Sequence, residues 1–225
     1  MQIHEGHNNA RKFFNSKTAS SYDSIVCLTT FGQDFLWKNH ISTILGKREN
    51  ILDLACGTGI LSSLLSKSDK RQVIGLDLTL DYLKIAKKKK RDYFFINGNA
   101  ELLPYKSDSF NGIMSSYLAK YVDIRKLVEE CWRVLKHNGI IVFHDFTYPH
   151  NIAIRSLWSA YFAALQIIGN FVAPWKIVFR DLIEVIRNTK WVEQMVYVLK
   201  QTGFKTISCK FYTMGTAAIV SAKKP

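Results

Sequence analysis

A glycine-containing segment near residue 55 has the residue types of a ligand-binding loop. It reads Asp53-Leu-Ala-Cys-Gly57-Thr-Gly59, follows an apolar run and precedes a helical pattern. Glycine lets the backbone approach a ligand, and the free N–H groups of a following helix attract an anion such as a carboxylate. The spacing D-x-A-x-G-x-G is neither the dinucleotide fingerprint nor the P-loop. The segment therefore predicts a binding loop of another class.

Two further polar groups follow the next two apolar runs. Asp77 stands eighteen residues after Gly59, and Asn99 begins the stretch Asn99-Ala100-Glu101. In doubly wound sheets such positions meet in one crevice, where a carboxylate accepts both hydrogen bonds of a ribose diol. An asparagine amide matches an adenine edge. Taken singly, a structural turn or a surface aspartate would explain each feature; together they predict a site for a nucleoside-bearing ligand.

Short apolar runs alternate with helical patterns through the middle of the chain. The runs are β-branched or aromatic and too short for helices, so they predict strands. Such alternation indicates parallel strands with right-handed crossovers, and hence an α/β, doubly wound sheet. The expected strands are 50–54, 72–77, 92–97, 110–115 and 139–145; the expected helices are 60–67, 80–90 and 124–135, the last capped by Asp123 and ended by His137-Asn138-Gly139.

The 225 residues suit one domain with a single core. Residues 1–45 are expected to form an N-terminal helical cap and residues 46–149 the binding core. Residues 150–190 form an apolar helical insertion, and residues 191–225 a last helix and a C-terminal hairpin.

Charge is the unusual part of the composition. Lys and Arg number 31 against 18 Asp and Glu, which gives a formal net charge of +13. This excess attracts polyanions, either nucleic acid or an anionic membrane surface. The hydrophobic share of 48% and charged share of 22% exclude a disordered chain, a fibre and a multi-span membrane protein.

The cysteines and the N-terminus predict a reduced, cytoplasmic protein. Cys27, Cys56, Cys131 and Cys209 form no C-x-x-C pair, and we expect them to be buried small hydrophobes. The first residues lack the apolar core of a signal peptide. The histidines show no metal-ligand spacing, so no metal is expected. The sequence leaves the oligomeric state open.

At this point the chain resembles class I S-adenosylmethionine-dependent methyltransferases, in segments 53–59, 77, 99–105 and 108–114. The resemblance implies a Rossmann-like, seven-stranded sheet in the order 3-2-1-4-5-7-6, and S-adenosylmethionine as cofactor. It places Asp53, Gly57 and Gly59 at the methionine end, Asp77 at the ribose and Asn99-Ala100 at the adenine. Many members have glycine where this chain has Ala55. The full set of expected cofactor-binding residues is Asp53, Ala55, Gly57, Gly59, Asp77, Leu78, Asn99, Ala100 and Ser115.

A closer resemblance, to the UbiE/MenG family, covers most of the chain. It is carried by the segment 14–23, by Leu36-Trp37-Lys38, by 145–149 and by 212–215. The family C-methylates the ring of ubiquinone and menaquinone precursors, which implies a prenylated quinone or hydroquinone substrate. One departure stands out: a family segment similar to G-L-R-N-V reads Tyr117-Leu-Ala-Lys120-Tyr here, so Ala119 replaces an arginine expected in the active site. Lys120 offers a nearby positive charge.

Residues 156–175 independently favour an apolar substrate. They carry no charge, and fourteen of the twenty are apolar. Twenty uncharged residues are enough to span a bilayer, but Gln166, Asn170 and Pro174 interrupt them. A buried core helix is a second interpretation. We favour a helical lid whose apolar face lines a prenyl-tail channel or contacts an anionic membrane peripherally.

Ring methylation needs a general base or fixed positive group near the hydroquinone oxygen, because a ring carbon is a poor nucleophile until its neighbouring phenol is deprotonated. The expected catalytic residues are Tyr22, Tyr117 and His144. Asp145 is the alternative to His144, because adjacent strand residues face opposite sides. Asp23 is expected to brace the N-terminal cap.

Other functions remain open at this stage. Methylation of a phospholipid amine or another small molecule would also use an apolar lid. An RNA methyltransferase would use the charge, but the basic run 87–91 is typical of a solvated helix face and no nucleic-acid module is visible. We therefore expect no nucleic-acid partner. A binding subunit without activity is the last alternative, and the intact loop and Asp77 disfavour it.

Overall fold

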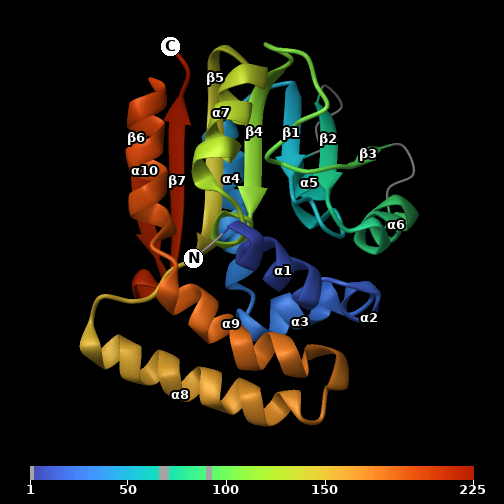
Figure 1. The fold of residues 1–225 in the computed structure, drawn as a ribbon, viewed down its shortest axis with the longest axis vertical. Helices are drawn as coiled ribbons and strands as arrows, with labels where there is room; N and C mark the ends of the chain where they lie inside the picture. The colour runs from blue at the N-terminus through green and yellow to red at the C-terminus, as the bar shows by residue number, and fades with distance from the viewer. Residues whose placement is uncertain (1–2, 66–70, 90–92) are drawn as a thin grey trace.

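Seven strands form one sheet in the order β3-β2-β1-β4-β5-β7-β6 (Figure 1), as the resemblance predicted. The computed structural model describes residues 3–65, 71–89 and 93–225. Strands β1 to β5 are parallel, and β7 runs antiparallel to both β5 and β6. The strands are β1 (Asn50–Leu54), β2 (Gln72–Asp77), β3 (Phe94–Asn97), β4 (Phe110–Ser116), β5 (Leu135–Phe146), β6 (Lys205–Tyr212) and β7 (Ala217–Lys223).

Helices cover both faces of this sheet and gather beyond the carboxyl ends of its parallel strands (Figure 1). The α-helices are α1 (Ile3–Phe13), α2 (Ser16–Ala19), α3 (Tyr22–Thr29), α4 (Gln33–Leu45), α5 (Ile60–Leu65), α6 (Leu80–Lys89), α7 (Ile124–Val134), α8 (Ile152–Gly169), α9 (Lys176–Asn188) and α10 (Trp191–Thr202). Short 3₁₀ turns are η1 (Ala119–Tyr121), η2 (Ala173–Trp175) and η3 (Thr213–Gly215).

Two apolar layers hold the sheet between its helices. On one face, Ile41 and Leu45 of α4 pack with Leu65 of α5 against Ile51 and Met114. On the other, α7 and α10 supply buried side chains that include Leu127, Cys131, Met195 and Leu199. Buried side chains recur at helical spacing on α7, which explains why its amphipathic pattern was readable from sequence. These layers fix the edge of the sheet that carries the site.

The boundary between α7 and β5 differs from the prediction. Asp123 caps α7 as expected, accepting hydrogen bonds from the N–H groups of Arg125 and Lys126. The helix, however, ends at Val134 rather than at His137-Asn138-Gly139. Leu135 already pairs with Phe110 of β4, so the strand begins four residues before Gly139. Sheet pairing has overridden the local turn signal.

A third apolar cluster lies outside the sheet and joins the N-terminal helices to α8 and α9. Phe13 packs with Tyr121, with Trp158 and Phe162 of α8, and with Phe179 of α9. Figure 1 shows α8 and α9 beyond the carboxyl ends of the strands, next to α1 and α3. The interpretation of residues 156–175 as a buried core helix is wrong, because α8 buries only Trp158, Phe162, Leu165 and Gly169.

Cys56 and Cys131 are buried as expected, but Cys27 and Cys209 are exposed, so the expectation of four buried thiols is wrong. The predicted helix 60–67 and strand 92–97 extend into residues outside the described ranges. Lys90 and Arg91 of the basic run also lie outside them.

Candidate active site

The turn after β1 is held in place by the carboxylate at the end of β2. The Gly57 N–H donates to Asp77 Oδ2 over 2.8 Å, and the Thr79 N–H donates to Asp77 Oδ1 over 2.7 Å. Gly57 has φ +57° and Ala55 has φ +53°. Positive φ is costly for any residue with a Cβ, so Ala55 holds a backbone conformation that glycine would adopt without strain.

Gly59 lies where the loop packs against α6 and β3. Its φ is +77°, and an added Cβ would lie 3.3 Å from Ala86 Cβ and 3.4 Å from Phe95 Cζ. The lining of the crevice described below includes Gly57 but not Gly59. The second glycine of the loop thus lets α5 approach α6 and β3.

A crevice opens at the carboxyl ends of β1, β2 and β4. Of the expected cofactor-binding residues, it is lined by Ala55, Gly57, Asp77, Leu78, Asn99 and Ala100. The Asn99 Oδ1 accepts a hydrogen bond from the Glu101 N–H over 2.9 Å, so its carbonyl oxygen is turned to the loop. Helix α1 and the turn after it close the other side with residues that sequence reasoning missed: His7, Ala10, Arg11 and Phe14.

Asp53 lies in a small adjoining cavity rather than in the main crevice. That cavity is also lined by Lys38, Thr58 and Ser116. Ser62 Oγ donates to Asp53 Oδ2 over 2.6 Å. Burial raises the pKa of Asp53 to about 7, against the opposing effects of the Ser62 hydrogen bond and the Lys38 charge.

Ser115 is turned away from these cavities. Its hydroxyl donates to the Leu54 carbonyl over 2.6 Å and ties β4 to β1. Its neighbour Ser116 lines both the crevice and the small cavity. Successive side chains of a strand face opposite sides, so a shift of one residue separates the expected residue from the one that faces the site.

A much larger apolar cavity lies on the other side of Tyr22 and Tyr117. It encloses about 1400 Å³ including its open mouth. Helices α3, α8 and α9 supply most of its wall. The lining from residues 150–190 comprises Ile154, Leu157, Trp158, Tyr161, Phe162, Leu165, Trp175, Val178, Phe179 and Leu182.

The crevice and the apolar cavity meet at a set of aromatic rings. Phe14, Tyr22, Tyr117 and Tyr121 line both spaces. Tyr22 and Tyr117 also line the small cavity beside Asp53. The Tyr22 ring packs edge to face on Tyr82 at 5.3 Å between centroids. A ligand group held among these rings would face both compartments.

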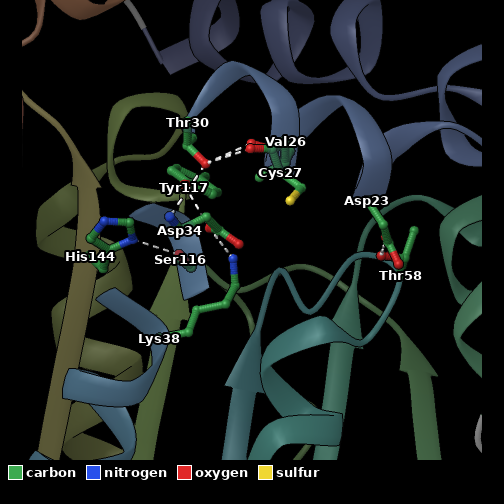
Figure 2. A network of polar contacts seen from close by, with 10 residues as sticks. All are labelled: Asp23, Val26, Cys27, Thr30, Asp34, Lys38, Thr58, Ser116, Tyr117 and His144. Carbon is green, nitrogen blue, oxygen red and sulfur yellow. Dashed lines mark hydrogen bonds and ion pairs between the residues drawn. The ribbon is translucent and has the colours of Figure 1, made fainter. Parts of the chain in front are cut away.

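Tyr117 is fixed by a buried acid that the sequence did not single out. Figure 2 shows the Tyr117 hydroxyl and the Lys38 ammonium both directed at the Asp34 carboxylate, and the Tyr117 Oη donates to Asp34 Oδ1 over 2.7 Å. Burial, reinforced by Asp34, raises the pKa of Tyr117 well above its ordinary value. Tyr117 is therefore a neutral phenol whose orientation is set by α4.

His144 lies behind this wall and not in it. Its Nδ1 is 2.6 Å from Ser116 Oγ, and its ring packs 5.1 Å from both Trp37 and Tyr117. The linings of the crevice and of both cavities omit it. Burial lowers the pKa of His144 well below its ordinary value. A neutral His144 can position Ser116 and Tyr117, but it does not line the space where a substrate would lie.

Two acids flank the site without facing the cavities. Asp145 pairs with Lys120, and both are buried. Asp23 accepts a hydrogen bond from Thr58 Oγ1 over 2.5 Å, and this bond ties α3 to the glycine loop (Figure 2). Asp23 also pairs with Lys89 of α6. Within residues 3–65, 71–89 and 93–225, no group of three His, Cys, Asp or Glu side chains could hold a metal ion.

Comparison with known proteins gives a consistent result. Residues 2–224 match the ubiE/COQ5 methyltransferase family. The ubiquinone/menaquinone biosynthesis C-methyltransferase UbiE of Proteus mirabilis is 32% identical, over 95% of this chain and 88% of that protein. The demethylmenaquinone methyltransferase of Oceanobacillus iheyensis is 30% identical over 89% of both chains. An S-adenosylmethionine-dependent methyltransferase structure from Methanococcus maripaludis shares the fold, with a TM-score of 0.67, 19% identity and 94% of each chain covered.

The crevice fits S-adenosylmethionine. Asp77 would accept hydrogen bonds from the ribose hydroxyls, Leu78 and Ala100 would contact the adenine, and Asp53 would pair with the methionine ammonium group. The sulfonium supplies an electrophilic methyl group. The chain belongs to the ubiE/COQ5 methyltransferase family, and it is an S-adenosylmethionine-dependent methyltransferase.

Proposed function

We propose that the enzyme methylates a ring carbon of a hydroquinone that carries a prenyl tail. The observation that carries the proposal is the apolar cavity that meets the cofactor crevice at Tyr22, Tyr117 and Tyr121. Such a cavity accepts a long hydrocarbon chain and leaves a planar ring among aromatic side chains. The named relatives are quinone-biosynthesis C-methyltransferases, which agrees with this chemistry.

The residues at the junction have separable tasks in this reaction. Tyr22 and Tyr117 contact the substrate ring and keep water from the transferring methyl group. The Asp34 carboxylate fixes the Tyr117 hydroxyl, and His144 fixes Ser116 from behind. We therefore assign Tyr22 and Tyr117 to substrate contact and His144 to positioning.

A transfer assay tests the substrate directly. The purified enzyme is incubated with methyl-labelled S-adenosylmethionine and, separately, prenylated demethylmenaquinol, the same naphthoquinol without a tail, phosphatidylethanolamine and RNA. We expect label in the prenylated quinol and much less in its tail-less analogue, because the cavity binds the tail. Label in phosphatidylethanolamine or RNA instead of quinol would overturn the proposal.

We also propose that the enzyme works peripherally, on the cytoplasmic surface of an anionic membrane. The mouth of the cavity is ringed by apolar side chains from three elements: Phe31 (79% exposed), Leu157 (68%) and Met214 (77%). The outward face of α8 continues this surface with Ile167, Ile168 and, just beyond the helix, Phe171. A prenylated quinone resides in the bilayer, so a mouth set in an apolar surface allows its tail to enter without crossing water.

Charge and helix composition agree with this placement. Among the described residues, α8 is the one helix that by length and composition could cross a membrane, and 22% of it is buried. Its packing on α9 through Trp158, Phe162 and Leu165 favours a helix that lies on the bilayer rather than through it. The net charge of +13 supplies attraction to an anionic surface.

Vesicle binding tests the docking surface. We expect the protein to bind vesicles that contain phosphatidylglycerol, with binding weakened by salt, and to bind phosphatidylcholine vesicles poorly. The double variant Phe31→Ser/Phe171→Ser should lose most binding without a change in thermal unfolding, because both side chains are exposed. Phe94→Ser, an exposed change on the edge strand β3, is the matched control. Equal binding by all three proteins would contradict the docking surface.

A further inference from the structure

A single charged side chain lines the apolar cavity in the described part of the chain. It is Lys120 in η1, the turn that follows β4, and it is 2% exposed. A buried ammonium group in an apolar wall is costly unless something pairs with it. The partner is Asp145 of β5, which is fully buried and contacts Lys120 Nζ through Oδ1.

The ammonium group lies at the aromatic junction. Its Nζ is 4.8 Å from the Tyr121 ring centroid, 5.4 Å from Tyr117 and 5.6 Å from Phe146. Tyr117 and Tyr121 are two of the rings shared with the cofactor crevice. Lys120 is thus beside the place where a substrate ring must lie to receive a methyl group.

Two buried polar atoms near this pair have no partner among the described residues. They are the second carboxylate oxygen of Asp145 and the hydroxyl of Tyr121. Unpaired polar atoms in native interiors point to a missing ligand or a functional role. Asp145 itself is absent from the cavity lining, so any substrate contact has to run through Lys120 or Tyr121.

We propose that Lys120 is a catalytic residue that contacts the phenol oxygen of the substrate, accepts its proton and then holds the phenolate as an ion pair. This inference rests on the proposed function. Asp145 acts through Lys120 as a positioning residue and shares its proton.

The proton balance closes within this pair. With one proton on the Asp145 carboxyl, the neutral Lys120 amine accepts the phenol proton and becomes ammonium beside a phenolate. After the ring carbon has gained the methyl group, it loses its own proton to water, and Lys120 returns a proton to the oxygen. Burial lowers the pKa of Lys120 and raises that of Asp145, which brings the neutral pair within reach.

Lys38, the other buried lysine near Tyr117, is placed differently. It pairs with Asp34 on its own helix and lines the small cavity beside Asp53, not the apolar cavity. The titratable residues around Lys120 are Asp145 from β5, Tyr117 and Tyr121, whose rings lie close to its Nζ, and His144, whose pKa the Lys120 charge helps to lower. Lys38 therefore lies on the cofactor side of the site, and Lys120 lies on the substrate side.

Steady-state kinetics on prenylated demethylmenaquinol give the first test. Lys120→Met should lower kcat about a hundredfold or more, the scale of a lost acid–base group, while KM for the quinol and the affinity for S-adenosylmethionine change little. Because this variant leaves Asp145 buried and unpaired, Lys120→Met/Asp145→Asn removes both charges and guards against misfolding. Lys126→Met, on the exposed side of α7, is the matched control. Wild-type kcat in a folded double variant would overturn the proposal.

A binding measurement separates this inference from the proposed function. The probe is a nitrophenol bearing a ten-carbon prenyl tail, whose phenolate absorbs at longer wavelength than its phenol. Its apparent pKa should be lower on the wild-type enzyme than on Lys120→Met or the double variant, by about one unit or more. Equal values on all three refute the role of Lys120. A lowered value on an enzyme that methylates no quinol refutes the proposed function alone.

Discussion

The cofactor crevice and the apolar cavity share a wall of aromatic rings, yet they are built in opposite ways. The crevice is made at the ends of neighbouring strands and is held by hydrogen bonds from backbone N–H groups, such as those of Gly57 and Thr79, to Asp77. The cavity is made mainly by apolar side chains of helices from the N-terminal segment and from residues 150–190. Its only charged lining residue within the described ranges is Lys120.

This difference separates what each half has to do. A polar ligand of fixed shape requires directed hydrogen bonds on a rigid sheet edge. A flexible hydrocarbon tail requires only volume and the exclusion of water. Substitutions in one half should therefore act on its ligand and spare the ligand of the other half.

The largest effect is expected in the crevice. Asp77→Ala should weaken S-adenosylmethionine binding about a hundredfold or more, because the two hydrogen bonds that the carboxylate accepts from the ribose hydroxyls contribute together about 3 kcal/mol. Isothermal titration measures it. Asp81→Ala, an exposed acid paired with Lys84 on the neighbouring helix, is the control and should bind normally. Unchanged affinity in Asp77→Ala would mean that the ribose is held elsewhere.

The matching change in the cavity is Leu165→Ala. Leu165 is buried and lines the cavity. The loss of contact between the leucine methyl groups and the tail should cost about 2 kcal/mol of binding free energy. This raises KM for the prenylated quinol about thirtyfold. The affinity for S-adenosylmethionine should not change. Gln166→Ala, on the exposed side of α8, should behave as wild type; a loss of cofactor affinity in Leu165→Ala would break the separation.

Asp53 gives a pH test of the crevice alone. Its folded pKa of about 7 lies above the ordinary value of 3.8, so its contribution to stability is complete below pH 4 and disappears as pH rises through 7. Between pH 6 and pH 8, the free energy of unfolding of the wild type should fall by about 1.4 kcal/mol relative to Asp53→Asn. Denaturant unfolding at both pH values measures it. Parallel pH curves for the two proteins would show that Asp53 ionises normally.

The smallest effect is expected at Ala55. Glycine adopts its φ of +53° without strain, so Ala55→Gly should raise the free energy of unfolding by about 1 kcal/mol. Chemical denaturation reports the change, with quinol KM as the unaffected reference. A destabilised variant would show that the Ala55 methyl group contributes more by packing than its backbone loses by strain.

Sequence reasoning was most successful where the signal is local. The turn from Asp53 to Gly59 and the acid at Asp77 each follow directly after a strand, so the sequence alone marks them. Six of the expected residues line the crevice. It failed at Ser115 by one residue, because register decides which of two adjacent serines faces the site. Gly59 was also expected at the ligand; it lies outside the crevice lining and close to Ala86 and Phe95.

Long-range partners were beyond reach for a different reason. Asp34 looks like an ordinary helix residue until the fold brings it to Tyr117, 83 positions away. Lys120 was noted as a nearby charge, but its pairing with Asp145 depends on how η1 meets β5. His144 was expected in the site because histidine is a common acid–base residue. The fold instead buries it behind Trp37 and Tyr117, so it does not line the cavities.

The open mouth between Phe31, Leu157 and Met214 has a consequence for selectivity. A closed pocket excludes ligands that are longer than the pocket. A channel that opens at a surface contacts only the part of the ligand inside it, so it does not select for total length. The first isoprene units would determine affinity, and the remainder would stay in the lipid. One enzyme of this shape can therefore serve a pool of quinones whose tails differ in length, and its rate should level off once the tail reaches the mouth.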